Sequence, residues 1–185
     1  MPIVRELKLP LDKVEYWTTE FPWGYTGDTA DFVLTLWDDN RGRYAIYLFE
    51  FKKDDINKEA LAEVLLYVPW VTQVLTQFRS ETTEVTVYPV IVGASTSLRF
   101  VPESYQFTMS FFGVLGAKRV TVESPIILEY IVRQAIPFQD KTRGARDTTI
   151  YYVKDLDLRT ARLPVKQFRP PPPLTYTTTK VEKDY

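Results

Sequence analysis

Residues 27–52, GDTADFVLTLWDDNRGRYAIYLFEFK, decide the fold that we predict for this chain. Two runs rich in β-branched and aromatic residues flank the turn-forming segment DDNRG at 38–42, a pattern that predicts a β-hairpin. From residue 44 to residue 49 the second run is apolar on both of its faces. Such a run indicates a central strand that is covered on both sides rather than one with a solvated face.

Three charged side chains stand at the open end of this predicted hairpin. If Trp37 and Tyr44 close its loop, the numbers of facing residues add to 81, and Asp31 lies opposite Glu50 with Cβ atoms about 5 Å apart. Lys52 follows Glu50 on the same face, because strand side chains alternate with a period of two. A surface cluster of cross-strand charges is one interpretation. The flanking apolar residues favour the other, a partly buried charged site.

Burial of two opposed carboxylates needs compensation by a cation or by hydrogen-bond donors. A bound Mg²⁺ or Mn²⁺ would supply it, since these hard ions prefer oxygen ligands and retain several water molecules. Asp28 precedes the first strand, where it either assists such an ion or serves as a turn residue. The open end of the hairpin is therefore the candidate site of the chain.

A helix follows the hairpin in the predicted order of elements. Asn57 is suited to be its N-cap, and residues 58–68 carry apolar side chains at helical spacing. Pro69 would kink or end this helix, although residues 70–78 can continue in helical form. The apolar run 85–92 then predicts a buried strand, joined to the hairpin by a right-handed crossover.

The remaining elements complete a single domain. We expect, in chain order, a strand at 3–9, a helix at 12–19, a helix at 103–112, a strand at 118–123, a helix that begins at Ser124 and Pro125 and runs to about Ala135, and a strand at 150–153. The domain would span residues 1–168. The proline-rich end, residues 169–185, would form an extended tail.

The amino-acid composition limits the possible chemistry. The 185-residue chain has no His and no Cys. This excludes Ser-His triads, thiol nucleophiles, disulfide scaffolds, and metal sites built on histidine or cysteine. Carboxylates, lysines, tyrosines and hydroxyl groups remain for chemistry. With no signal-like N-terminal run and no stretch of about 20 apolar residues, we expect a soluble, cytoplasmic protein with no membrane partner.

The net charge of −1 gives no overall attraction to nucleic acid, but the charges are unevenly distributed. Residues 1–139 hold 13 basic and 18 acidic side chains, whereas residues 140–185 hold 10 and 6. A basic strip between Lys141 and Arg169 would follow a phosphate backbone, or it is an ordinary solvated surface with paired charges. The DNA-contacting candidates in this strip are Arg143, Arg146, Arg159 and Arg162.

Together these residues resemble the PD-(D/E)XK nuclease superfamily, and particularly the archaeal NucS-type and recB-like endonucleases. The resemblance covers residues 27–93 and rests on Asp31, on EFK at 50–52 and on AEVLLYVPWV at 62–71. It implies a restriction-endonuclease-like mixed central β-sheet flanked by helices. It also implies that Asp31 and Glu50 bind Mg²⁺ or Mn²⁺, and that Lys52 orients the attacking water or stabilises the pentavalent phosphate.

The same resemblance assigns two helix residues to the site. Helices of the family usually carry a Gln and, four residues later, a Tyr; the matching positions here are Glu63 and Tyr67, which share one helix face. Glu63 in place of Gln would act as an extra metal or water ligand, or would mark an altered or lost activity. Leu66 stands where NucS-type helices have an Arg. The upstream helical Glu of the family corresponds to Glu15 or to Glu20.

These expectations lead to three functional hypotheses. The first is a metal-dependent nuclease that hydrolyses DNA phosphodiester bonds by water attack, as a homodimer that reaches both strands. The second is a catalytically weak or inactive nuclease-fold protein, of viral or mobile-element origin, that binds nucleic acid or has a structural role. The third is a protein-interaction adaptor whose proline-rich tail is the ligand.

Overall fold

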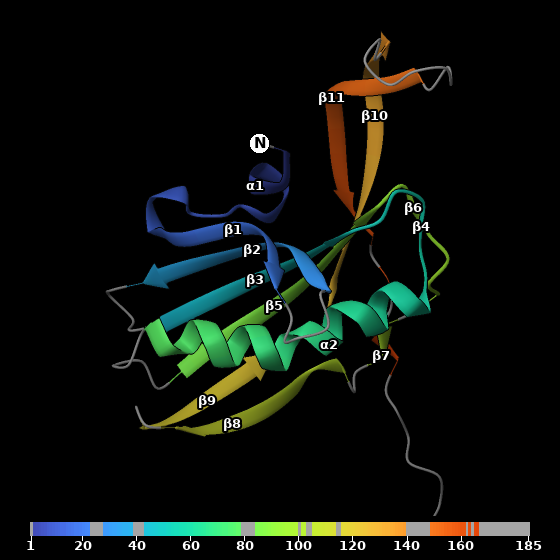
Figure 1. Ribbon diagram of the computed structural model, residues 1–185. Helices are drawn as coiled ribbons and strands as arrows, with labels where there is room; N and C mark the ends of the chain where they lie inside the picture. Colours follow the sequence, from blue (N-terminus) through green and yellow to red (C-terminus); the bar gives the residue numbers. More distant parts are fainter. Residues whose placement is uncertain are drawn as a thin grey trace, which may run out of the picture.

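The computed structural model describes residues 2–22, 28–38, 43–78, 84–99, 101–102, 105–113, 116–139, 149–161, 163 and 165–166. It is a mixed α/β fold in which a large mixed sheet is combined with few helices (Figure 1). The described helices are α1 (Pro2–Leu7) and α2 (Lys58–Leu75), with the short 3₁₀ segments η1 (Leu11–Lys13) and η2 (Thr76–Phe78). No helix in the described segments has both the length and the apolar character that crossing a bilayer requires.

The central sheet has one main path of strands and one branch. The path runs through β1 (Val14–Pro22), β2 (Thr29–Asp38), β3 (Arg43–Phe51), β5 (Glu84–Gly93), β10 (Ile126–Gln139) and β11 (Thr149–Thr160), and the branch consists of β9 (Gly116–Val122) and β8 (Phe107–Gly113). Strand β5 is parallel to β3, β9 and β10, whereas β1–β2, β2–β3, β8–β9 and β10–β11 are antiparallel. Short strands pair separately, β4 (Asp55–Ile56) with β6 (Ser95–Thr96) and β7 (Val101–Pro102) with β12 (Val165–Lys166).

The predicted hairpin and crossover are confirmed. Trp37 faces Tyr44, and the register holds from there to the pair of Phe32 and Phe49, as the sum of 81 requires. Strand β3 then connects through α2 to β5, which lies parallel to it in the same sheet. Phe49 is buried on one face of β3 and Ile46 on the other, so this central strand is covered on both sides.

Helix α2 covers one face of the sheet, and its buried apolar face continues past a proline within the helix. The side chain of Asn57 accepts a hydrogen bond from the amide of Ala60, which confirms the predicted N-cap. Pro69 lies inside the helix and does not end it, because the apolar face continues through Val71 to Leu75, both buried against the sheet. Packing of this face outweighs the loss of one helical hydrogen bond.

Gly93 allows the segment before α2 to approach the end of β5 closely. A Cβ atom at Gly93 would lie 2.5 Å from Cγ1 of Ile56 and 3.0 Å from the carbonyl oxygen of Asp54. Ile56 is fully buried, and its carbonyl accepts a hydrogen bond from the amide of Ser97. A residue without a Cβ is therefore needed at this contact, which sets where Asn57 begins the helix.

Two predictions near the N-terminus are wrong. The expected strand at 3–9 is the helix α1, whose residues Ile3, Val4 and Leu7 pack against the core on the face opposite α2. Their spacing fits one helical face as well as it fits a short strand. The expected helix at 12–19 belongs mainly to β1, which pairs with β2 along its length. Its aromatic and threonine residues suit a strand.

Two later helix predictions are also wrong, although the neighbouring strands are confirmed. The described part of the expected helix at 103–112 contains β8, which pairs with β9. The expected helix from Ser124 and Pro125 is β10, whose first residues pair in parallel with the end of β5. The predicted strands at 85–92 and 118–123 are confirmed as β5 and β9, and the one at 150–153 is part of the longer β11. The proline-rich tail, 169–185, lies outside the described residues.

Candidate active site

The end of β3 holds the candidate site. Alternation along the strand turns Glu50 toward α2, and the side chain of Glu50 is buried, with 4% of the residue exposed. The amide of Lys52 donates a hydrogen bond to the carbonyl of Val92 at 2.7 Å, which extends the pairing with β5 beyond the last residue of β3. The backbone that carries both side chains is thus fixed by the central strand of the sheet.

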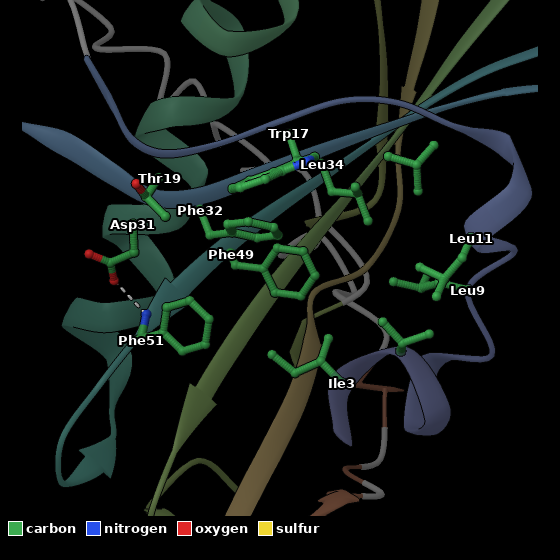
Figure 2. Close-up of a pocket in the computed structure, with 12 residues that line it drawn as sticks. Ile3, Leu9, Leu11, Trp17, Thr19, Asp31, Phe32, Leu34, Phe49 and Phe51 are labelled. Atoms are coloured by element: carbon green, nitrogen blue, oxygen red, sulfur yellow. Dashed lines mark hydrogen bonds between the residues drawn. The ribbon is translucent and has the colours of Figure 1, made fainter. Parts of the chain in front are cut away.

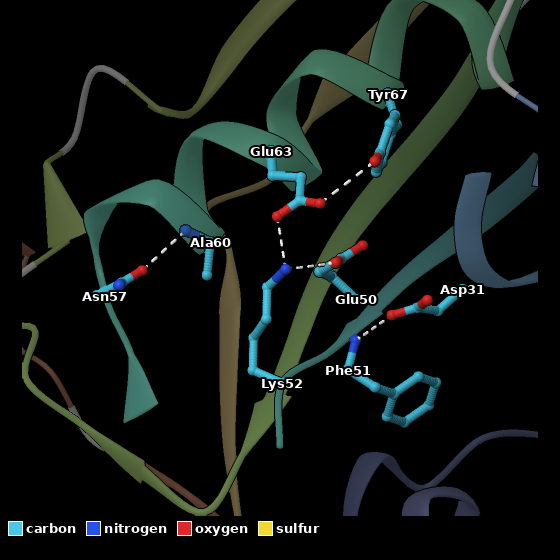
Figure 3. A network of polar contacts seen from close by, with 8 residues as sticks. All are labelled: Asp31, Glu50, Phe51, Lys52, Asn57, Ala60, Glu63 and Tyr67. Carbon is cyan, nitrogen blue, oxygen red and sulfur yellow. Dashed lines mark hydrogen bonds and ion pairs between the residues drawn. The ribbon is translucent and has the colours of Figure 1, made fainter. Parts of the chain in front are cut away.

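The ammonium of Lys52 joins β3 to α2. Its Nζ lies 2.7 Å from Oε1 of Glu50 and 2.5 Å from Oε2 of Glu63 on the helix (Figure 3). The hydroxyl of Tyr67, one helical turn further on, donates a longer hydrogen bond of 3.4 Å to Oε1 of Glu63. Four of the five residues predicted for the catalytic site are therefore linked in one hydrogen-bonded chain.

Asp31 reaches the site by a route that the sequence did not predict. The ladder between β2 and β3 stops at Phe32 and Phe49, one pair before Asp31 and Glu50. Beyond it, Oδ2 of Asp31 accepts a hydrogen bond of 2.6 Å from the amide of Phe51 (Figure 3). The expected direct pairing of Asp31 with Glu50 is replaced by this contact, yet the charge of Asp31 is close enough to act on Glu50.

The neighbouring strand is irregular beside Asp31. Glu20 lies between the β1 residues Thr19 and Phe21, which face Phe32 and Ala30 of β2. Its φ of 51° is in the left-handed region, which a non-glycine residue rarely adopts. The irregularity interrupts the alternation of side chains next to Asp31. It leaves Phe21 buried in the core beneath α2.

One oxygen of Glu50 is buried without a partner. Oε2 of Glu50 makes no hydrogen bond, whereas Oε1 accepts from Lys52. Burial raises the pKa of Glu50 to about 7; the hydrogen bond from Lys52 opposes this rise and the charge of Asp31 adds to it. An unsatisfied buried carboxylate oxygen costs about 1–3 kcal/mol or more. This free oxygen, together with the carboxylate of Asp31, could take part in holding a cation.

The same surroundings fix the protonation of Lys52 and Tyr67. Burial alone would lower the pKa of Lys52, but the hydrogen bonds and charges of Glu50 and Glu63 outweigh burial and raise it. Burial raises the pKa of Tyr67 to about 12, and the negative charges of Glu63, Glu50 and Asp28 act in the same direction. Near neutral pH the site therefore contains an ammonium and a phenol, both of which are hydrogen-bond donors.

The donor set fits a hard divalent ion that keeps most of its water. Asp31 and the unpartnered Oε2 of Glu50 offer carboxylate oxygens from two adjacent strands. Within the described residues, no three Asp, Glu, His or Cys side chains form a cluster that could hold a metal ion by themselves. Two carboxylates completed by water are the kind of site that Mg²⁺ commonly occupies.

The predicted nucleic-acid contacts are only partly within the described residues. Arg159 on β11 is exposed and forms an ion pair with Glu129 on β10, with Nη2 2.7 Å from Oε2. Glu129 faces Gly93 at the end of β5, so Arg159 lies at the same end of the sheet as Lys52. Arg143, Arg146 and Arg162 lie outside the described residues.

The upstream glutamates differ from the prediction. Glu15 and Glu20 lie on β1 and not on a helix, so neither occupies the expected helical position. The upstream helix α1 carries Glu6 instead, whose Oε1 accepts hydrogen bonds from the amide and hydroxyl of Thr160 on β11. These bonds lower the pKa of Glu6 and tie α1 to the sheet. Glu6 therefore serves the packing of α1.

Phe51 is a residue of the site that was not predicted from the sequence. Its amide holds Asp31, and its ring lies with that of Phe49 in the lining of an apolar cavity, on the face of β3 opposite Glu50 and Lys52. The signal was present in the alternation of residues 50–52, where an aromatic residue separates two charged ones.

No protein-family model matches this chain, and no curated protein and no solved structure matches it either.

Proposed function

We propose that this protein is a metal-dependent nuclease that hydrolyses DNA phosphodiester bonds, with a PD-(D/E)XK-type site on a restriction-endonuclease-like sheet. The proposal rests mainly on one observation: the unpartnered, buried Oε2 of Glu50 lies within the electrostatic reach of Asp31, beside an ammonium held by two carboxylates. In a purely structural ion pair, both buried carboxylate oxygens are expected to have hydrogen-bond partners. A carboxylate that binds a metal ion keeps one oxygen free for that ion.

Each residue has a separate task in this proposal. Asp31 and Glu50 would hold Mg²⁺ or Mn²⁺, which when bound supplies Lewis acidity and lowers the pKa of a bound water. Lys52 offers a fixed positive charge to the phosphate, where negative charge grows during attack. Glu63 holds that ammonium from the helix side, and Tyr67 in turn donates to Glu63. The phenol of Tyr67 remains protonated throughout the neutral range.

Binding of DNA is proposed to involve the same end of the sheet. Arg159 is exposed there, and the predicted basic strip would extend the contact along the phosphate backbone. We propose that a homodimer brings two such sites to the two strands of a duplex. The charge of Arg159 is already shared with Glu129, so its contact with a phosphate would be one of several.

A nuclease assay tests the proposal directly. Purified protein is incubated with single-stranded, duplex, flap and mismatched DNA in Mg²⁺, in Mn²⁺ or in EDTA. We expect cleavage with either ion, no cleavage in EDTA, and no cleavage by Glu50→Gln. The matched control is Glu59→Gln, which alters an exposed carboxylate in the first turn of α2. Cleavage that persists in Glu50→Gln would remove the site assignment.

A second function is favoured by the state of Lys52. Two carboxylates already neutralise this ammonium, which weakens its attraction for a phosphate. A nuclease-fold protein that binds nucleic acid without efficient cleavage would tolerate this arrangement. In that case we expect no cleavage product in Mg²⁺ or in EDTA. A separate binding measurement should then give equal DNA affinity in the two buffers.

A further inference from the structure

An apolar cavity of about 850 Å³ opens beside Asp31, on the face of the sheet opposite α2 (Figure 2). Its walls come from the N-terminal segment, which includes α1 and η1, and from β1, β2 and β3. Apart from Thr19 and Asp31, all the side chains that line it are apolar or aromatic. The cavity and the proposed active site therefore share one carboxylate, that of Asp31.

Aromatic rings lead through the cavity to Asp31. Trp17 contacts Phe32 with ring centroids 6.2 Å apart, and Phe32 contacts Phe49 at 5.3 Å. Phe49 is stacked on Phe51 with an interplanar angle of 8°, and the amide of Phe51 is the donor that holds Asp31. Phe49 itself is fully buried, so a flat ligand would stack on the accessible rings of this series and, at Phe51, would lie next to the proposed catalytic carboxylate.

Two of these rings are unusually accessible. Trp17 is 62% exposed and Phe51 is 42% exposed. Exposed aromatic faces at the mouth of an apolar cavity favour stacking with a planar group rather than closure of a protein core.

We infer that this cavity receives an unpaired nucleobase of the strand whose phosphate lies at Asp31 and Glu50. The inference rests on the proposed function and adds a substrate requirement, namely a strand that is locally single. A base enters the cavity only after it has left the stack of a duplex. Stacking on aromatic side chains accepts any base, so the cavity selects unpaired nucleotides and not a sequence.

A binding measurement in EDTA, where the proposed nuclease cannot cleave, tests this inference separately from the proposed activity. In EDTA, fluorescence anisotropy measures the affinity for a labelled short oligothymidylate, for the same strand made of abasic residues, and for a duplex. We expect the strand with bases to bind about tenfold more tightly than the abasic strand, and Trp17→Ala to abolish that difference. Trp17→Phe, which keeps a ring, should retain most of it.

Tyr16→Ala is the matched control. Tyr16 precedes Trp17 on β1, is 41% exposed, and is not among the residues that line the cavity. It should leave the preference for bases unchanged, and a thermal melt of each variant checks that the fold is intact. Equal binding of the normal and abasic strands by the wild-type protein would overturn the inference. So would a fatty acid that fills the cavity without competing with the oligonucleotide.

The two proposals can fail separately. Binding that depends on bases, in a protein that cuts nothing with Mg²⁺ or Mn²⁺, rejects the proposed nuclease activity and retains the base-binding cavity. Cleavage that is abolished by Glu50→Gln but is equally fast in wild type and Trp17→Ala on single strands retains the nuclease and rejects the cavity.

Discussion

The ammonium of Lys52 lies 2.5 Å from a carboxylate oxygen of Glu63, so the end of the central strand is tied to the second turn of α2 by an ion pair. Because Glu50 holds the same ammonium from the strand, the helix carboxylate is a second partner that Lys52 does not need for its charge. We therefore expect Glu63 to control how much positive charge the site can offer to a phosphate.

Replacement of Glu63 tests this control. Glu63→Gln removes one negative charge but keeps a hydrogen-bond acceptor for Lys52 and Tyr67, so cleavage by the proposed nuclease should be preserved or increased. Glu63→Ala removes the contact itself and should reduce cleavage. Initial rates of DNA cleavage in Mg²⁺ distinguish these outcomes, and Glu59→Gln is the control on the same helix. Equal rates for wild type, Gln and Ala would mean that this helix face has no part in the site.

Removal of the buried carboxylate should separate activity from stability. Glu50→Gln, Asp31→Asn and Lys52→Ala are each expected to abolish cleavage. For the two acid-to-amide changes, the melting temperature in EDTA should be unchanged or higher, because one of two neighbouring negative charges is removed. Glu84→Gln, at the exposed start of β5, is the control. A large fall in melting temperature for Glu50→Gln would instead indicate a structural ion pair.

The raised pKa of Glu50 predicts a pH dependence of stability in the metal-free protein. Burial raises this pKa from an ordinary 4.5 to about 7, so the folded state binds the proton more tightly than the unfolded state. The stabilising contribution is complete below about pH 4.5 and is lost as the pH rises through about 7. Urea denaturation of wild type and Glu50→Gln in EDTA should therefore show an advantage of the variant that grows across this range. A constant difference would contradict the assignment.

Arg159 should contribute to DNA affinity through a phosphate contact. Arg159→Ala, alone or combined with Arg162→Ala, is expected to weaken binding, and each lost contact should reduce the slope of log K against log salt concentration by about one. Titrations at several salt concentrations measure the slope. Arg133→Ala is the control, since Arg133 is also exposed and ion-paired, with Asp157, on the same two strands. An unchanged slope for Arg159→Ala would place the DNA elsewhere.

The sequence predicted those features that depend on local periodicity. The register of β2 and β3 follows from a turn and two alternating runs, and the shared face of Glu50 and Lys52 follows from strand spacing. Helix α2 was predicted for the same reason, together with its cap at Asn57. In each case a few neighbouring residues contain the whole signal. The position of Glu63 beside Lys52 was expected only from the resemblance to PD-(D/E)XK nucleases.

The features that were not predicted depend on distant partners. Ser124 and Pro125 have the pattern of a helix start, but the parallel partner that β5 offers to Ile126 and Ile127 makes the segment a strand. The bond from Phe51 to Asp31 arises where a ladder ends beside the irregular backbone of Glu20. Neither event is visible in the composition or in the spacing of the residues involved.

The close contact at Gly93 makes the geometry of the candidate site depend on a position with no chemistry of its own. A methyl group there would push against Ile56, and Asn57 and α2 follow directly in the chain, so Glu63 would move relative to Lys52. A mutational scan of the proposed nuclease would then report Gly93 among its most sensitive positions. A search pattern built from catalytic residues alone would omit it. The distance between α2 and the end of β5 thus depends on the absence of a side chain at Gly93.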